Sequence, residues 1–497
     1  MTDSIEVKHD GQVLSDDRVD SGQGHHDRVD RMGSASVVRL VIEFALPAIA
    51  GMVVNGAYNL IDSIFLGQAL GEIGLSTATV ANPIMIFFMA LSMLFGTGGN
   101  ALAALRLGER RREDAELSLG NTVSLSIFIS VFIAVVVLFE PSLNALLSLA
   151  GCTEEIRPFA QSFVTILGLG YIFQCIGMGV NNFIRTAGAP TRALVTMLIG
   201  AASCTVLNFL FVLVFDWGVV GSALATVLGQ GISCIAVLWF FLVTKSAPIK
   251  LKRKYLRLSG KTVRLILGLG VASFLVQIGA SVVNLVLNNM LATIGAQSPM
   301  GAEDALASIG VVQRVAVFSV LPLIGVSIAI QPLLGYNYGA HLFNRVRQTL
   351  GFGVAVAMGL GFIMWILIHV FPGEIVRAFG ISHPGLEEFT AFALMVQLSL
   401  LPFVGFQIVG SNYFQATGQP LKSVVLSLTR QILFLIPLLL MLPYYLPLWF
   451  PQFTALDALY FAHPISDFFA TLLTLVLILF ELRRLKKIEA GKIKARF

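Results

Sequence analysis

The chain is built from long apolar runs, and this feature most limits what it can fold into. A helix needs about 20 apolar residues to cross the hydrocarbon core of a bilayer. Twelve runs reach that length. With approximate edges they are 37–66, 77–107, 117–147, 157–180, 190–215, 219–243, 265–295, 305–337, 346–371, 387–414, 421–446 and 457–481. The pattern predicts an all-α membrane protein with twelve transmembrane helices and both ends on one side.

Composition excludes the other broad classes. Of 497 residues, 56% are hydrophobic and 12% are charged, about half the charged share of a soluble domain. The four cysteines are scattered, without the spacing of a disulfide framework or a metal site. No G-x-x-x-x-G-K-[ST] loop for nucleotide phosphates is present. We therefore expect neither an enzyme, nor a metal protein, nor a nucleic-acid-binding protein.

The loops alternate in charge and predict the topology. One set is rich in Lys and Arg: 110–112, 185–192, 245–264, 345–347, Lys422 and the tail from Arg483. The other set is acidic and includes Glu72, Glu154, Glu155, Asp216, Glu303, Asp304, Glu374, Glu387, Glu388 and Asp457. Basic loops stay in the cytoplasm. Both termini and the central loop are therefore predicted to be cytoplasmic.

The same pattern divides the chain into five regions. Residues 1–35 are polar and are predicted to form a disordered cytoplasmic tail. A first six-helix bundle covers 36–244, a basic cytoplasmic linker covers 245–264, and a second six-helix bundle covers 265–482. A basic cytoplasmic tail, 483–497, ends the chain.

Two motifs repeat at almost the same distance along the chain. Asn182, Gly188, Pro190 and Arg192 recur as Asn412, Gly418, Pro420 and Lys422, each 230 residues later. The segment from Asn100 to Gly108 recurs 231 residues later, from Gln331 to Gly339. A helix end, a Gly that caps it and a Pro that starts the next helix explain the first motif. Six helices repeated in the same orientation predict a duplication into two homologous bundles.

These motifs resemble the MATE (multidrug and toxic compound extrusion) family, in its MepA-like and DinF-like branch. The resemblance covers residues 36–482 and includes Pro47 to Gly67, the GGNALAALRLG stretch ending at Gly108, Gly218 to Gln230, and His463 to Asp467. It implies two bundles around a V-shaped cavity in a bacterial plasma-membrane protein. The implied activity is multidrug efflux: an antiporter, as a monomer, would export amphiphilic or cationic drugs in exchange for H⁺ or Na⁺. No cofactor besides the coupling ion is implied.

Charged side chains inside apolar spans are costly and usually functional. Asp62 is the clearest example. Asn59 and Asp62 follow Asn55 by four and seven residues, so the three share one helix face. The resemblance makes Asp62 the cation-coupling acid. It also assigns Cys204 and Asn208 to a polar pair in the fifth helix. The alternative reading is a structural acid near the outer helix end.

A polar stripe and a methionine stripe are the candidates for the substrate cavity. Gln277, Ser281, Asn284 and Asn288 share one face of the seventh helix, together with Ser273. They face either the cavity or a neighbouring helix as hydrogen-bonding contacts. Met85, Met89 and Met93 share a face of the second helix and would suit varied drugs or plain packing.

Pro47 and the other individual charged residues have simpler interpretations. Pro47 lies inside the first helix and is predicted to kink it, so that protonation of Asp62 would change the bend. Arg106, Arg185 and Arg314 are interpreted as helix-end or loop residues, and Asp467 as the start of the last helix. The spans therefore hold few buried basic residues.

Three other readings compete with a drug antiporter. A lipid-linked or metabolite exporter (flippase) of the same superfamily is the main alternative. A carrier of the major facilitator type would need a Gly-Asp-Arg loop between helices 2 and 3, where this chain has RRRED. A channel or receptor would not need the duplication. The expected partners are small-molecule drugs or organic cations and membrane lipids.

Overall fold

The computed structural model describes residues 29–150, 152–154, 156–244, 247–297, 301–379 and 384–492. For residues 59, 60, 62–64, 66–73, 75, 292, 302, 303 and 384 it describes the helical backbone and not the side chain. The elements are α2 (Val37–Gly108), α3 (Arg112–Leu138), α4 (Glu140–Leu149), α5 (Arg157–Thr186), α6 (Pro190–Asn208), η1 (Phe209–Val214), α7 (Gly218–Leu242), η2 (Arg253–Leu256), α8 (Gly260–Gly295), α9 (Ala302–Gly339), α10 (Phe343–Val370), α11 (Pro372–Ala378), α12 (Pro384–Gln397), α13 (Leu401–Ala416), α14 (Pro420–Leu428), η3 (Thr429–Leu435), α15 (Ile436–Trp449) and α16 (Ala455–Glu489).

Helix α2 holds the first two predicted spans in one continuous element. Its apolar spans are Val37–Tyr58 and Ser76–Gly108. A straight helix of 72 residues would be about 108 Å long, yet both ends of α2 lie beside Tyr336. Gly33, just before α2, packs on the Tyr336 ring, and Gly108 packs on its carbonyl oxygen. The chain therefore reverses direction between the two spans.

The described residues contain eleven helical segments long and apolar enough to span a membrane. A twelfth span is a helix pair, Gly385–Gln397 and Leu401–Ala416, bent by 42°. Pro402 follows this break, where the ring and the missing N–H disfavour a continuous helix. Pro141 likewise lies at the start of α4, where the predicted third run is divided. The twelve-helix prediction is confirmed.

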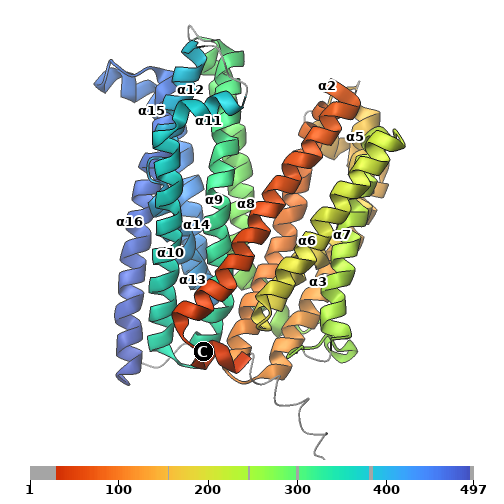
Figure 1. The fold of residues 1–497 in the computed structure, drawn as a ribbon, viewed down its shortest axis with the longest axis vertical. Helices are drawn as coiled ribbons and strands as arrows, with labels where there is room; N and C mark the ends of the chain where they lie inside the picture. Colours follow the sequence, from red (N-terminus) through yellow and green to blue (C-terminus); the bar gives the residue numbers. More distant parts are fainter. Residues whose placement is uncertain are drawn as a thin grey trace, which may run out of the picture.

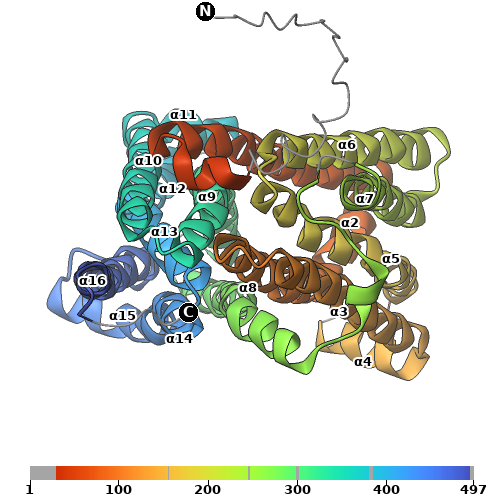
Figure 2. The same ribbon diagram turned by 90° about the horizontal axis from the view of Figure 1, so that it is seen from below.

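The helices form two halves. The N half comprises α2–α7 and the C half comprises α8–α16. In Figure 1 the N half, red to yellow-green, and the C half, green to blue, meet at the lower end and diverge upward. Seen from below in Figure 2, α3–α7 lie on one side and α9–α16 on the other, with α2 and α8 between them. This arrangement is the predicted pair of bundles.

The repeated motifs occupy equivalent places in the two halves. Gly188 and Gly418 both have a φ of 75°, the left-handed conformation that Gly adopts without strain after a helix. Pro190 and Pro420 then start α6 and α14. Asn100 Nδ2 donates to Gln331 Oε1 at 3.2 Å. The two residues that the repeat aligns therefore meet each other across the boundary between the halves.

Glycines allow the halves to touch through their backbones. A Cβ on Gly108 would collide with the carbonyl oxygen of Tyr336, and one on Gly339 with that of Leu105. Further along, Gly98 packs on the Ile266 carbonyl and Gly270 on the Leu94 carbonyl. Larger residues would force the two halves apart at these points.

The end of the predicted disordered tail is ordered, which corrects that prediction for residues 29–35. Residues 29–34 form a short helix, and Met32 is 1% exposed. Arg345 of α10 donates to the carbonyl oxygens of Met32 at 3.1 Å and Ala35 at 2.7 Å. Asn337 Nδ2 also donates to Met32 O, at 3.1 Å. These bonds satisfy backbone groups that would otherwise need water. Residues 1–28 lie outside the described part of the chain.

The central basic segment is attached to α3. Lys252 Nζ lies 2.6 Å from Glu116 Oε2, and the Lys250 backbone N–H donates to Glu116 Oε1 at 3.1 Å. Glu116 is 1% exposed. Asn121 Nδ2 donates to Tyr255 O at 3.1 Å. Helix α8 begins at Gly260, inside the segment predicted as linker. The connection between the halves therefore belongs structurally to the N half.

Substitution of Gly270 tests the backbone contact between the halves. Gly270→Ala should lower the melting temperature of the purified protein, because its Cβ would overlap the Leu94 carbonyl oxygen. Gly268→Ala is the matched control, since nothing lies within 4 Å of a Cβ there. In a helix interior Ala is favoured over Gly by about 1 kcal/mol, so the control should hold or raise the melting temperature. Equal effects of the two changes in a thermal-shift assay would contradict the contact.

Cys152 tests the predicted topology. It is partly exposed between α4 and α5, while Cys175, Cys204 and Cys234 are buried. A membrane-impermeant maleimide should label intact cells through Cys152, and Cys152→Ser should remove the label. Partial burial raises the pKa of the Cys152 thiol, and Arg157 opposes this shift. Because the thiolate reacts, labelling should keep rising with pH above the ordinary thiol pKa. Labelling only after cell lysis would contradict the topology.

Candidate functional site

A cavity of about 260 Å³ lies in the N half, between α2, α5, α6 and α7. Most of its surface is apolar, with Met52, Met89, Met93, Met178, Met197 and Phe173 among the lining residues. Its polar lining consists of Asn55, Tyr58, Ser92, Thr97, Gln174, Asn181, Asn182, Arg185, Gln230 and Ser233. An apolar cavity with a few polar groups is the usual form of a small-molecule site.

A polar cluster borders this cavity where α2 meets α6. The Cys204 thiol donates to Tyr58 Oη at 3.1 Å and lies 3.9 Å from Thr226 Oγ1. Asn208 Nδ2 lies 3.8 Å from Cys204 Sγ, and Asn208 is fully buried. Asn208 ends α6 where the π-helix η1 begins. Such π-bulges often mark functional positions in helices.

Three of the four predicted cation-coupling residues lie along the same part of α2, and the fourth, Asn208, ends α6. Asn55 lines the cavity, and Asn208 belongs to the polar cluster. Asn59 and Asp62 lie in α2, and their side chains are outside the described part of the structure. Asp62 follows Tyr58 by four residues, about one helical turn. The backbone thus carries Asp62 close to the polar cluster, and its role stays a prediction.

The predicted methionine stripe divides between the cavity and the core. Met89 and Met93 line the cavity, while Met85 packs against the neighbouring hydrophobic core of the N half. Pro47 lies inside α2, and the helix continues through it. The assignment of these four residues to transport stays a prediction.

The polar stripe of α8 lies away from the N-half cavity. Gln277 and Ser281 are half-buried, and Ser281 Oγ donates to Gln277 O at 3.2 Å. Asn284 and Asn288 are exposed. At the other end of the stripe, Ser273 joins the boundary between the halves. There its Oγ accepts from Gln415 Nε2 at 3.1 Å and from Thr97 Oγ1 at 3.0 Å.

Arg185 is a cavity residue, and its interpretation as a helix-end or loop contact was incomplete. It lies in the last turn of α5 but is 1% exposed. Its burial comes from α2 and α6, which close over the end of α5 around the cavity. The sequence signal was the Asn181-Asn182 pair one turn earlier, which supplies oxygen acceptors for a buried guanidinium.

The C half contains an ion pair between a buried acid and a partly buried arginine, which the sequence analysis missed. Arg430 Nε lies 2.8 Å from Asp467 Oδ1, and Ser466 Oγ donates to Arg430 O at 2.7 Å. The prediction that Asp467 starts the last helix is wrong. Asp467 lies well inside α16 and is 6% exposed. The acid in the first turn of α16 is instead Asp457, which forms a capping box with Thr454. Arg430 was hidden inside an apolar run, flanked by Thr429 and Gln431.

The duplication relates the N-half cavity to the ion pair of the C half. The 230-residue repeat places Arg430 where the N half has Gly200. Asp467 follows the first residue of α16 by twelve positions, as Gln230 follows the first residue of α7. Gly200 and Gln230 line the N-half cavity. At the corresponding positions of the C half stand Arg430 and Asp467, which pair with each other.

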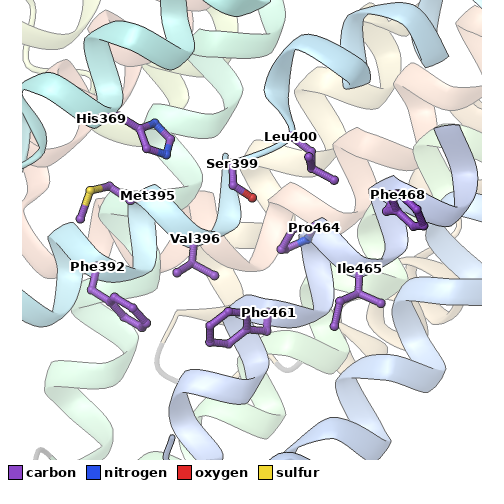
Figure 3. Close-up of a pocket in the computed structure, with 10 residues that line it drawn as sticks. All are labelled: His369, Phe392, Met395, Val396, Ser399, Leu400, Phe461, Pro464, Ile465 and Phe468. Atoms are coloured by element: carbon purple, nitrogen blue, oxygen red, sulfur yellow. The ribbon is translucent and has the colours of Figure 1, made fainter.

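A second cavity, of about 590 Å³, lies in the C half beside the break between α12 and α13 (Figure 3). Phe392, Phe461 and Phe468 form much of its wall. His369 lies at one side, stacked on Trp365 with 4.3 Å between ring centroids. Its lining residues carry no acid, Lys or Arg, so this cavity suits apolar groups. Within the described residues, no cluster of three His, Cys, Asp or Glu could hold a metal ion.

A two-lobed bundle of twelve apolar spans, with a cavity between the helices of one lobe, defines an integral membrane transporter. The chain belongs to the MatE family, whose model matches residues 47–212 and 272–441. This establishes the predicted family, and with it a transporter rather than an enzyme.

Three relatives illustrate the similarity. Multidrug export protein MepA of Staphylococcus haemolyticus (strain JCSC1435) is 23% identical over 396 residues, covering 80% of this chain and 85% of MepA. A crystal structure of a MATE protein in complex with MaL6 has a TM-score of 0.84 at 22% identity, covering 92% of this chain and 99% of its own. The outward-facing conformation of a multidrug resistance MATE transporter has a TM-score of 0.84 at 21% identity, covering 92% and 98%.

The ion pair of the C half predicts a specific pattern of stability. Asp467→Leu leaves the guanidinium of Arg430, whose side chain is 29% exposed, without its carboxylate, which should lower the free energy of unfolding by about 1–3 kcal/mol. The double variant Arg430→Met/Asp467→Leu removes both charges and should recover most of that loss. Melting temperatures of the purified proteins in one detergent give the order. A double variant no more stable than Asp467→Leu would contradict the pairing.

Proposed function

We propose that this protein is a secondary active multidrug exporter, and that the N-half cavity binds the drug. The observation that carries the proposal is the cavity itself, with its methionine-rich wall and its few polar groups. Met side chains adapt to ligands of different shapes. The export of drugs by the MepA relatives supports the same function. Amphiphilic compounds, organic cations among them, would leave the cell by alternating access.

The proposed energy source is the exchange of the drug for H⁺ or Na⁺. Asp62 is the proposed cation-binding acid, with Asn55, Asn59 and Asn208 as neighbouring oxygen ligands. The polar cluster of Tyr58, Cys204 and Asn208 supports this, because it lies one helical turn from Asp62. In the proposed cycle, cation binding changes the bend of α2 near Pro47 and closes the cavity.

The proposed setting is the bacterial plasma membrane, with both termini in the cytoplasm and the protein as a monomer. The alternative function is export or flipping of a lipid-linked compound or a metabolite. The buried Arg185 in the N-half cavity wall is the observation that favours this alternative, because a basic cavity suits anionic lipid-linked compounds.

Efflux of ethidium from cells tests the proposal. Wild-type cells should extrude ethidium under an imposed proton gradient or an imposed sodium gradient, and the gradient that works identifies the coupling ion. Asp62→Asn should reduce efflux to that of cells lacking the protein, because the amide cannot be a proton carrier or a charged ligand. Asp216→Asn is the matched control. Asp216 is exposed, and Asn tolerates its φ of 54°.

The outcomes separate the two functions. Gradient-driven efflux that persists in Asp62→Asn would overturn the role of Asp62. Absence of efflux under both gradients, with normal amounts of protein in the membrane, would overturn drug export and favour the lipid or metabolite exporter.

A further inference from the structure

Arg185 is a cation buried in the wall of the N-half cavity. It is 1% exposed and lines the cavity next to Asn181, Asn182 and Met197. Moving a charge out of water costs several kcal/mol unless other groups compensate for it. The groups around Arg185 that offset the cost of burying its charge therefore indicate which kind of ligand the cavity can bind.

Neutral groups hold one side of the guanidinium. Arg185 Nη1 donates to Asn181 Oδ1 at 3.0 Å and to Asn182 Oδ1 at 2.6 Å. The end of α5 also favours a positive charge, because the helix dipole is negative there. These contacts orient the side chain without neutralising it.

The other edge of the guanidinium has no strong hydrogen-bond acceptor among the described residues. Nη2 contacts Met197 Sδ at 3.4 Å, and a thioether is a weak acceptor. Arg185 Nε is buried and has no hydrogen-bond partner among the described residues. The Nε and Nη2 hydrogens lie side by side, and this edge of a guanidinium binds a carboxylate through two parallel hydrogen bonds.

No acid in the described part of the cavity wall meets this edge. The lining residues include no Asp or Glu. Asp62, whose side chain is not described, lies further along α2. The α2 residue that packs on Met197 is Gly51, and Asp62 is eleven residues beyond it, about 16 Å along the axis. That distance exceeds the reach of an Asp side chain.

We propose that the N-half cavity binds amphiphiles that carry a carboxylate, and that Arg185 binds this carboxylate through its Nε–Nη2 edge. This inference rests on the proposed function, since it names the substrate class for the same cavity. Met52, Met89 and Phe173 offer apolar surface for the rest of the molecule. The substrates would then include acids and zwitterions, whose carboxylate pairs with Arg185, besides the compounds that bind through the apolar wall alone.

Equilibrium dialysis with the purified full-length protein in nanodiscs tests this. The probes are 2-naphthoate and 2-naphthamide, which have nearly the same shape and differ in charge. Wild type should bind 2-naphthoate about tenfold or more tightly than the amide, as charge-assisted bidentate pairing predicts. Arg185→Gln should abolish the preference, and Arg185→Lys should keep part of it. Arg157→Gln is the matched control, because Arg157 starts the same helix and pairs with Glu154 outside the cavity.

Equal wild-type affinities for the two probes would overturn the proposal, and this result needs no variant to fold. A preference that survives in Arg185→Gln would also overturn it. Tighter binding of 2-naphthyl phosphate than of 2-naphthoate would overturn the carboxylate assignment. Dialysis uses no ion gradient, so it is independent of efflux. Loss of ethidium efflux with an intact naphthoate preference would refute the proposed function alone, and the reverse result would refute this inference alone.

Discussion

Backbone-to-backbone packing between the halves determines the arrangement of the rest of the molecule. Gly108 and Gly339 each pack on a carbonyl of the other half, and Gly98 and Gly270 do the same on α8 and α2. A membrane offers little hydrophobic drive for helices to associate, so close approach through small residues must supply the attraction. Asn100 and Gln331 add a hydrogen bond at this boundary. Figure 1 shows the result, with the halves joined at one end and diverging at the other.

The two halves handle buried charge in opposite ways. In the C half, Arg430 and Asp467 neutralise each other inside the bundle. In the N half, small and neutral residues occupy the equivalent positions, and the space becomes a cavity with the uncompensated Arg185 in its wall. The duplication thus produced two bundles with the same arrangement of helices. Substitution then left an ion pair at these positions of the C half and cavity-lining residues at those of the N half.

The sequence predicted features that depend on residue type and local spacing. The helix count, the duplication, and the Gly and Pro at 188–190 and 418–420 all followed from such signals, because Gly adopts the left-handed conformation after a helix without strain. Asn55, Met89 and Met93 reached the cavity because helical spacing places them on one face. Arg185 and Arg430 were misjudged because their burial depends on other helices packing over them. A Thr-Arg-Gln triplet inside an apolar run was the signal available for Arg430.

The contact between Gly108 and Gly339 has a consequence for how such a chain can change over generations. Each glycine faces the backbone of the other copy, as residues do across the two-fold interface of a homodimer. A gene duplication normally frees one copy to diverge. Here the two copies constrain each other, because a side chain larger than that of Gly at either position would collide with the backbone of the other half. These positions should therefore remain small in both halves, while the interiors of the halves drift apart.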